Sequence, residues 1–384
     1  MLSCPHAQEK LSKLHTLKQD FEDVFQRATK EGNSSPLWHE AKLLKRELEQ
    51  QMQSLSQELN PFETFNLEEQ YESQLNILKD SNLLETLGNG EQGIQGIPFF
   101  DTQGNPTEQR HYPIPSLDQI IDWMRDKEEL LKQKHQQGFT KMLLVPFGLP
   151  LERLTTAYQE QLQEHFNNHQ LFLPRNNPED QDEQQTTVSE LNPMYIFEQY
   201  PDADLSNTTK KQHKTEGIVY YPQQFTNDHK GHTKQELLTT PPPQFHTLSQ
   251  GWKILFVEDL THIPRETQGT TKEQRPQLEA NKSPNEYLAH TQDTTTENPY
   301  QHEQGMTPED WFILALTNLH TKNEVTDDYA SNIGSTCFLT GSYLPSVACV
   351  PRAYWDRGDA RAGLGGSDAG GRWRDGGSRA VVGV

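Results

Sequence analysis

A chain of 384 residues is long enough for two or three domains, but only 32% of its residues are hydrophobic and its formal net charge is −21 at pH 7. This balance predicts disordered segments and argues against general nucleic-acid binding, which needs clustered lysine and arginine. With three cysteines and no run of 18 apolar residues, the sequence signals no disulfide framework, no four-ligand zinc site and no membrane span. Because the N-terminus has no apolar export signal, we expect a cytoplasmic protein, with surface display as the alternative.

Residues 1–60 are predicted to form a coiled-coil-like helical hairpin. Apolar residues recur every three or four positions in two stretches, which are separated by a polar break at 32–36. The second stripe includes Leu44, Leu48 and Met52. A lone hairpin buries its apolar faces poorly, so we expect it to pack on a neighbour or to form a homo-oligomer.

Residues 61–225 are predicted to be an α/β segment of unknown role. Ser116 and Gln119 have the spacing of a capping box, and they open one helix that continues to Leu131. A strand is predicted at 142–145, a helix at 151–166, and further strands at 194–197, 218–221 and 254–257. Polar tracts with prolines at 174–190, 203–215, 226–248 and 265–303 are predicted to be mobile insertions and linkers.

Two further helix starts follow, at Ser283 and Thr307, each with proline at the next position and an acidic residue at the third. After the second helix the chain becomes rich in glycine and strand-like, with strands predicted at 337–339 and 381–382. Together these elements predict an α+β protein.

The last 34 residues, 351–384, have a composition of their own. They contain nine glycines and six arginines but no Lys, Glu, Gln, Asn, His, Thr or Ile, the types whose codons are mostly rich in adenine. Adenine-directed mutagenesis of a gene end would leave such a pattern. At strand periodicity Ala353, Trp355 and Arg357 share one face and alternate with a second face. The alternative is a flexible tail.

Other candidate sites are weak. His229 and His232 have metal-ligand spacing but lie in a polar tract, which favours a solvated loop without a metal. The acidic pair at 258–259 is expected in a turn or a helix cap. Cys337 and Cys349 have no activating neighbour in the sequence and are expected to be small buried residues. No catalytic or nucleotide-binding motif is present, so we expect no enzyme.

The segments 252–260, 281–288, 304–311, 341–343 and 350–357, and the ending 377–381, resemble the variable proteins of diversity-generating retroelements, those of small host-dependent bacterial lineages above all. The resemblance covers about 250–384 well and the remainder loosely. It implies a C-type-lectin-like domain of the formylglycine-generating-enzyme subtype over 226–384. It also implies a hypervariable region at about 350–384, rewritten by a template-directed reverse transcriptase.

The resemblance assigns two sets of residues to the tail. The framework would be Pro351, Ala353, Trp355, Arg357, Arg361, Leu364, Asp368, Gly377 and Arg379. The diversified, ligand-binding positions would be Arg352, Tyr354, Asp356, Gly358, Asp359, Gly365, Ser367, Gly371, Arg372, Trp373, Arg374 and Ser378. Several of these hold glycine, which predicts a poor binding surface for this variant.

The implied function is non-enzymatic binding of a protein or cell-surface ligand, without any cofactor. Two alternatives stay open. One is an oxidase-like enzyme of the formylglycine-generating type that uses Cys337 or Cys349. The other is a helical scaffold with a disordered tail.

Overall fold

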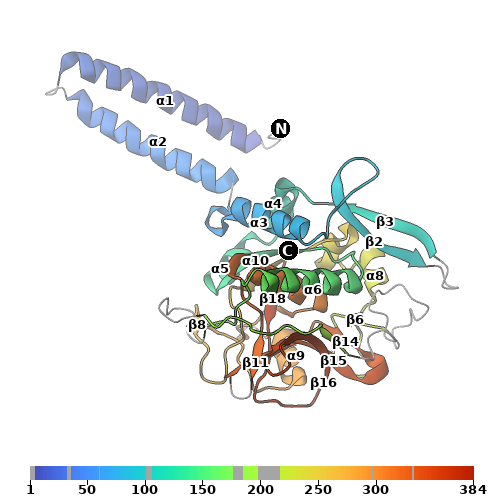
Figure 1. The fold of residues 1–384 in the computed structure, drawn as a ribbon. Helices are drawn as coiled ribbons and strands as arrows, with labels where there is room; N and C mark the ends of the chain where they lie inside the picture. The colour runs from blue at the N-terminus through green and yellow to red at the C-terminus, as the bar shows by residue number, and fades with distance from the viewer. Residues whose placement is uncertain are drawn as a thin grey trace. The chain divides into compact units, whose positions relative to one another are not determined.

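The computed structural model describes residues 5–32, 36–59, 61–100, 106–175, 185–197, 217–295, 297–330 and 333–384 (Figure 1). They form two compact units, Met1–Asn66 and Leu67–Val384, of mixed helix and sheet. The α+β class is therefore confirmed. The expected division between 61–225 and 226–384 does not hold, because strands from both stretches pair in one sheet.

The first unit is the predicted hairpin. Helices α1 (Pro5–Glu31) and α2 (Leu37–Leu59) pack on each other and are followed by the 3-10 turn η1 (Glu63–Phe65). Val24, Ala28 and Ala41 are buried between the helices. The Trp38 indole closes the turn, since its Nε1 donates to the Gly32 carbonyl at 3.1 Å.

Part of the hairpin's apolar surface stays open. Phe25 is 44% exposed, Leu43 52% and Met52 54%. Met52 belongs to the predicted stripe, so one hairpin does not cover that stripe completely.

The second unit is built on an antiparallel sheet of four strands in the order β10 (Gln304–Gly305), β18 (Ala380–Gly383), β7 (Lys253–Glu258) and β4 (Phe139–Val145). Helix α10 (Pro308–Lys322) packs on β4 and on helices α3 (Leu67–Asp80) and α6 (Leu151–Asn167). Every residue of α10 from Pro308 to Leu319 is buried, so this helix forms the centre of the core.

The predicted helix starts are confirmed. The Ser116–Gln119 and Ser283–Glu286 capping boxes are formed, and the Asp310 carboxylate accepts from the Thr307 backbone N–H at 2.8 Å. They open α4 (Leu117–Arg125), α9 (Pro284–Gln292) and α10. The single helix expected after Ser116 is divided, because α4 ends and α5 (Glu128–Gln136) begins anew. The sequence analysis missed α3 and the sheet of β1 (Glu85–Thr86), β2 (Gln92–Phe100) and β3 (Pro106–Pro113).

Two of the four tracts predicted to be linkers are packed structure. The tract at 226–248 contains α8 (Lys234–Thr239) and runs into the 3-10 segment η2 (Pro243–Gln250). The tract at 265–303 contains the hairpin β8 (Thr271–Lys272) and β9 (Arg275–Pro276), and also α9. Of the other two tracts, 203–215 lies outside the described residues, as does 176–184 within 174–190.

Buried charge explains why these tracts were misjudged. The Arg275 guanidinium is fully buried, donates to both carboxylate oxygens of Glu303 at 2.7 and 2.8 Å, and lies 4.5 Å from the Phe139 ring centre. Glu303 also accepts from the Lys134 ammonium at 2.6 Å. His229 is buried as well, so the expectation of a solvated loop is wrong: its Nδ1 accepts from the Gly231 backbone N–H at 2.9 Å. The polar composition of these tracts therefore reflects buried ion pairs and not exposure to solvent.

The tail belongs to a second, seven-stranded sheet. Strand β15 (Cys349–Asp356) pairs along its whole length with β16 (Arg361–Asp368). Its other edge meets β11 (Asp328–Ala330) and β13 (Thr336–Phe338). The sheet continues through β12 (Ile333–Gly334), β17 (Gly376–Ser378) and β5 (Tyr195–Ile196). The interpretation of 351–384 as a flexible tail is therefore wrong.

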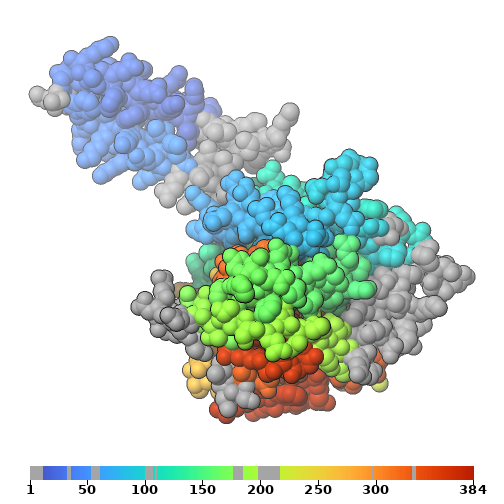
Figure 2. Space-filling model, in the orientation of Figure 1, coloured from blue at the N-terminus to red at the C-terminus, as the bar shows by residue number. Residues whose placement is uncertain are grey.

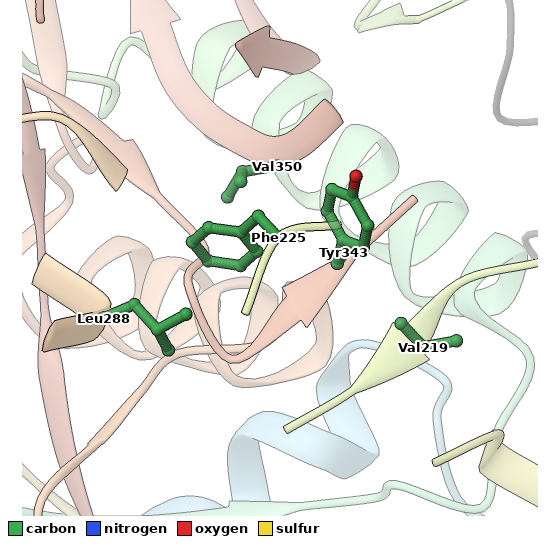
Figure 3. Packing of buried hydrophobic residues seen from close by; sticks show 5 residues of the cluster. All are labelled: Val219, Phe225, Leu288, Tyr343 and Val350. Carbon is green, nitrogen blue, oxygen red and sulfur yellow. The ribbon is translucent and has the colours of Figure 1, made fainter. Parts of the chain in front are cut away.

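A hydrophobic cluster packs this sheet against other elements of the unit (Figure 3). It comprises Val219, Phe225, Leu288, Tyr343 and Val350, and Phe225 lies between Leu288 and Tyr343 in this view. Val219 is in β6 (Val219–Tyr220), which pairs with β14 (Ser342–Tyr343). Residues far apart in the sequence thus hold β15 at one end. None of the described helices is long and apolar enough to cross a membrane.

Two histidines make the stability of the second unit sensitive to pH. His165 of α6 and His320 of α10 have ring centres 5.6 Å apart. Burial lowers the pKa of both below the usual value, and the His165 charge lowers the pKa of His320 further. The unfolded chain therefore takes up these protons at a higher pH than the folded chain, so their contribution to stability is present above about pH 6.5 and is lost as the pH falls.

We expect the melting temperature to drop between about pH 7.5 and about pH 5.5, and to drop less in a His165→Gln/His320→Gln variant. His246→Gln, a change at an exposed histidine, is the matched control, and its melting temperature should drop as much as that of the wild type. An equal drop in the double variant and the wild type would contradict this assignment.

Candidate ligand-binding surface

Strand β15 separates the tail's residues into a buried and an outward-facing set. Ala353 and Trp355 are buried, whereas Arg352, Tyr354 and Asp356, which alternate with them, are partly exposed. The alternation expected from the sequence is thus present in the strand. In Figure 2 the last strands (red) lie along one end of the Leu67–Val384 unit and reach its surface.

The residues expected to form the framework are mostly buried, and two of them form ion pairs with adjacent aspartates. Arg379 donates to the two carboxylate oxygens of Asp327 at 2.7 and 3.1 Å, and the Trp311 Nε1 donates to the same carboxylate at 2.9 Å. Arg357 donates through its Nε to the Asp328 carboxylate at 2.8 and 2.9 Å. Such bidentate pairs fix the arginine heads and the strand that carries them.

Close packing explains one framework glycine. A Cβ on Gly377 would lie 2.7 Å from the Ile263 side chain, so a larger residue does not fit without movement. Pro351 and Leu364 are also buried. Asp368 and Arg361 differ from this pattern. Asp368 is exposed and accepts from the Gly370 N–H at 2.8 Å, and half-buried Arg361 pairs with Asp359.

The outward-facing set is centred on Arg352. Its guanidinium carbon lies 4.8 Å from the ring centre of Tyr354 and 4.7 Å from that of Trp373. Trp373 comes from the turn after β16 and is 44% exposed. Burial raises the pKa of Tyr354, against the opposing effect of the Arg352 charge. These contacts preassemble an Arg–aromatic surface before any ligand arrives.

The glycines of β16 make room for this surface. Tyr354 lies opposite Gly363 and Arg352 opposite Gly365 in the strand pairing. A Cβ on Gly363 would come within 2.5 Å of the Tyr354 ring, and one on Gly365 within 3.5 Å. Gly365, a predicted binding residue, is therefore buried under its neighbours. The glycines leave room for the Tyr354 ring above β16.

The sequence analysis missed Tyr195. Strand β5 runs parallel to β16 and places Tyr195 beside Gly363. The Arg361 guanidinium lies 5.4 Å from the Tyr195 ring centre, so a second Arg–aromatic contact extends the first. The run 194–197 was predicted to be a strand, but no local signal shows that it pairs with a segment so distant in the sequence.

The remaining predicted binding positions divide by location. Gly358, Asp359, Arg372 and Arg374 are exposed, and Gly371 is half-buried. Asp356 accepts from the N–H groups of Gly358 and Asp359 at 2.8 and 3.1 Å and so holds the turn between β15 and β16.

Two predicted binding residues besides Gly365 are not on the surface. Ser367 is buried, and Ser378 is buried with its Oγ donating to the Phe338 carbonyl at 3.0 Å. A ligand on the outer face would not reach either side chain, so these two assignments are corrected. In β17 the chain pairs with β13, which turns Ser378 inward.

The cysteines lie apart from this surface chemistry. Cys337 and Cys349 are free thiols, and burial raises the pKa of both, that of Cys337 well above its usual range. Asp327 adds to the shift at Cys337, and Asp368 to that at Cys349. The nucleophilic thiolate form is therefore disfavoured.

Of the carboxylates at 258–259, Glu258 faces Arg275 at 3.3 Å and Asp259 faces Lys141 at 2.6 Å, so both are ion-pair partners. Within the described ranges no three ligand-type side chains are grouped to hold a metal ion.

Comparison with known proteins adds no family: no protein-family model, no curated protein and no solved structure matches the chain.

Proposed function

We propose that this protein is a non-enzymatic ligand-binding protein whose C-terminal domain is C-type-lectin-like and presents side chains diversified by a retroelement reverse transcriptase. One observation carries the proposal. In β15 the expected framework residues are buried, while Arg352, Tyr354 and Asp356 face outward from the same strand. A strand of this kind can change its outer residues without disturbing its core.

The composition of the tail supports the same proposal by an independent route. The residue types lost from 351–384 are those with adenine-rich codons. The outward set is also rich in the side chains that dominate binding surfaces, namely tyrosine, tryptophan and arginine. The ligand is proposed to be a protein or a cell-surface group, and binding needs no cofactor.

The proposal is tested by comparing tolerance to substitution at the two sets of positions. We expect nearly all single substitutions at 352, 354 and 373 to leave the second unit resistant to protease, because these side chains rest on the surface. Most substitutions at 353, 355 and 379 should remove that resistance, because they disturb buried packing. Equal tolerance at both sets would contradict the proposal.

The raised pKa values of the two thiols argue against the enzyme alternative. An oxidase that used Cys337 or Cys349 would need an activated thiolate, and the raised pKa of each opposes that form. The scaffold alternative required a disordered tail, which the paired strands β15 to β18 do not provide.

The N-terminal hairpin is proposed to join copies of the chain. Exposed Phe25, Leu43 and Met52 leave apolar area that a second hairpin could cover. Association of this kind would present several binding surfaces together and raise the avidity for a repetitive ligand.

A further inference from the structure

Arg352 differs from four of the other five arginines of the tail in what surrounds its charge. Arg357, Arg361, Arg372 and Arg379 each pair with a carboxylate, of Asp328, Asp359, Glu286 and Asp327 respectively. Arg352 contacts the rings of Tyr354 and Trp373, and no carboxylate of the described residues pairs with it. Its Nε is buried over Gly365 without a hydrogen-bond partner.

We propose that Arg352 is the anchor for a single carboxylate on an acidic segment of a protein partner, with Tyr354 and Trp373 packing against the apolar neighbour of that carboxylate. This inference rests on the proposed function, because it names the ligand class of the same surface. A guanidinium presents its N–H groups in a planar fork that matches the two oxygens of a carboxylate. The two rings hold the fork in place beforehand, which lowers the entropy lost on binding.

The charges around Arg352 select one carboxylate over a polyanion. A nucleic-acid backbone needs several cations spaced along its phosphates. On this face Asp356 follows Arg352 and Tyr354 in the outward-facing set of β15, Asp359 pairs with Arg361, and the whole chain carries a net charge of −21. Repulsion by these negative charges therefore opposes the binding of a run of phosphates or of acidic residues. A single carboxylate that reaches Arg352 still pairs both of its oxygens with the guanidinium. The chemistry fits an aspartate or glutamate flanked by an apolar or aromatic residue.

A random-peptide selection tests this directly. The full chain is immobilised, and a phage-displayed library of random dodecapeptides is selected on it. Enriched peptides are then synthesised and their Kd values are measured by fluorescence anisotropy. We expect one shared acidic position beside an apolar residue, and little enrichment of acidic runs. Arg352→Gln should weaken binding at least tenfold, and Arg352→Lys by an intermediate factor, because lysine keeps the charge and loses the fork.

The matched control is Arg153→Gln. Arg153 is an exposed arginine on α6 that pairs with Glu85 and with the Asn82 carbonyl, neither of which is in the tail, and its replacement should change Kd by less than twofold. The melting temperature of Arg352→Gln should match that of the wild type. Weaker peptide binding by this variant then reflects the lost contact and not a loss of fold. If Arg352→Gln melts early, Arg352→Lys carries the test.

The outcomes distinguish this inference from the proposed function. Neutral peptides whose binding weakens in Trp373→Ala but not in Arg352→Gln would overturn the carboxylate anchor and leave the binding surface in place. Peptides insensitive to both changes would overturn both. An absence of enriched peptides would overturn the acidic-segment assignment. Tighter, Arg352-dependent binding of a single-stranded 20-mer DNA would replace it with a nucleic-acid ligand.

Discussion

Replacing Trp355 with alanine is expected to lower the free energy of unfolding of the second unit by about 3–5 kcal/mol, the usual cost of deleting a large aromatic side chain from a core. Its indole is 1% exposed, and its strand is paired on both edges, with β11 and β16. The loss combines the transfer of the indole to water with the cavity that remains.

Trp373→Ala is the matched control, because the same side chain is removed from the same tail. Trp373 is 44% exposed and its ring centre lies 4.7 Å from the Arg352 guanidinium carbon, so about 1 kcal/mol or less should be lost. Urea unfolding followed by circular dichroism gives both values. Similar losses for the two tryptophans would show that the tail has no division into core and surface.

The second large effect is expected at Arg379. The Arg379→Met change leaves the buried Asp327 carboxylate without its counter-charge, and breaking a buried pair in this way costs about 3–5 kcal/mol. Arg372→Met removes an exposed pair with Glu286 and should cost about 1 kcal/mol or less.

A double variant separates lost charge balance from lost packing. Arg379→Met/Asp327→Asn removes the uncompensated charge and keeps an oxygen that accepts from the Trp311 Nε1. Denaturant melts should show that it regains part of the stability lost in Arg379→Met. If the double variant were less stable than the single one, the ion pair would not explain the effect.

Local patterns predicted much of this fold. The period of two in 353–357 indicated which side chains of β15 are buried, and the Ser–Pro and Thr–Pro pairs marked the starts of α9 and α10. Trp355 and Leu364, which the resemblance assigns to the framework, are buried, whereas Trp373 is 44% exposed. These features depend on neighbouring residues alone, and the sequence records them directly.

The errors concern contacts between distant segments. The pairing of β4 with β7 joins two stretches that composition separates, and β5 brings Tyr195 to the candidate binding surface from outside the tail. Arg275 and Glu303 lie in a tract predicted to be a mobile linker, yet they form a buried network of opposite charges with Lys134. The burial of Ser378 also depends on a distant segment, because β17, which carries it, pairs with β13.

The most direct test of the central claim is the DNA sequence that flanks the coding region. Diversification of the outward set requires a near-copy of the last hundred or so bases of the gene, beside a reverse-transcriptase gene. We predict that the copy differs from the coding end mainly where the copy has adenine, with the differences falling on codons for outward residues such as Arg352, Tyr354 and Trp373. A flanking sequence without such a copy, or differences concentrated on the codons of Trp355 and Arg379, would contradict the account.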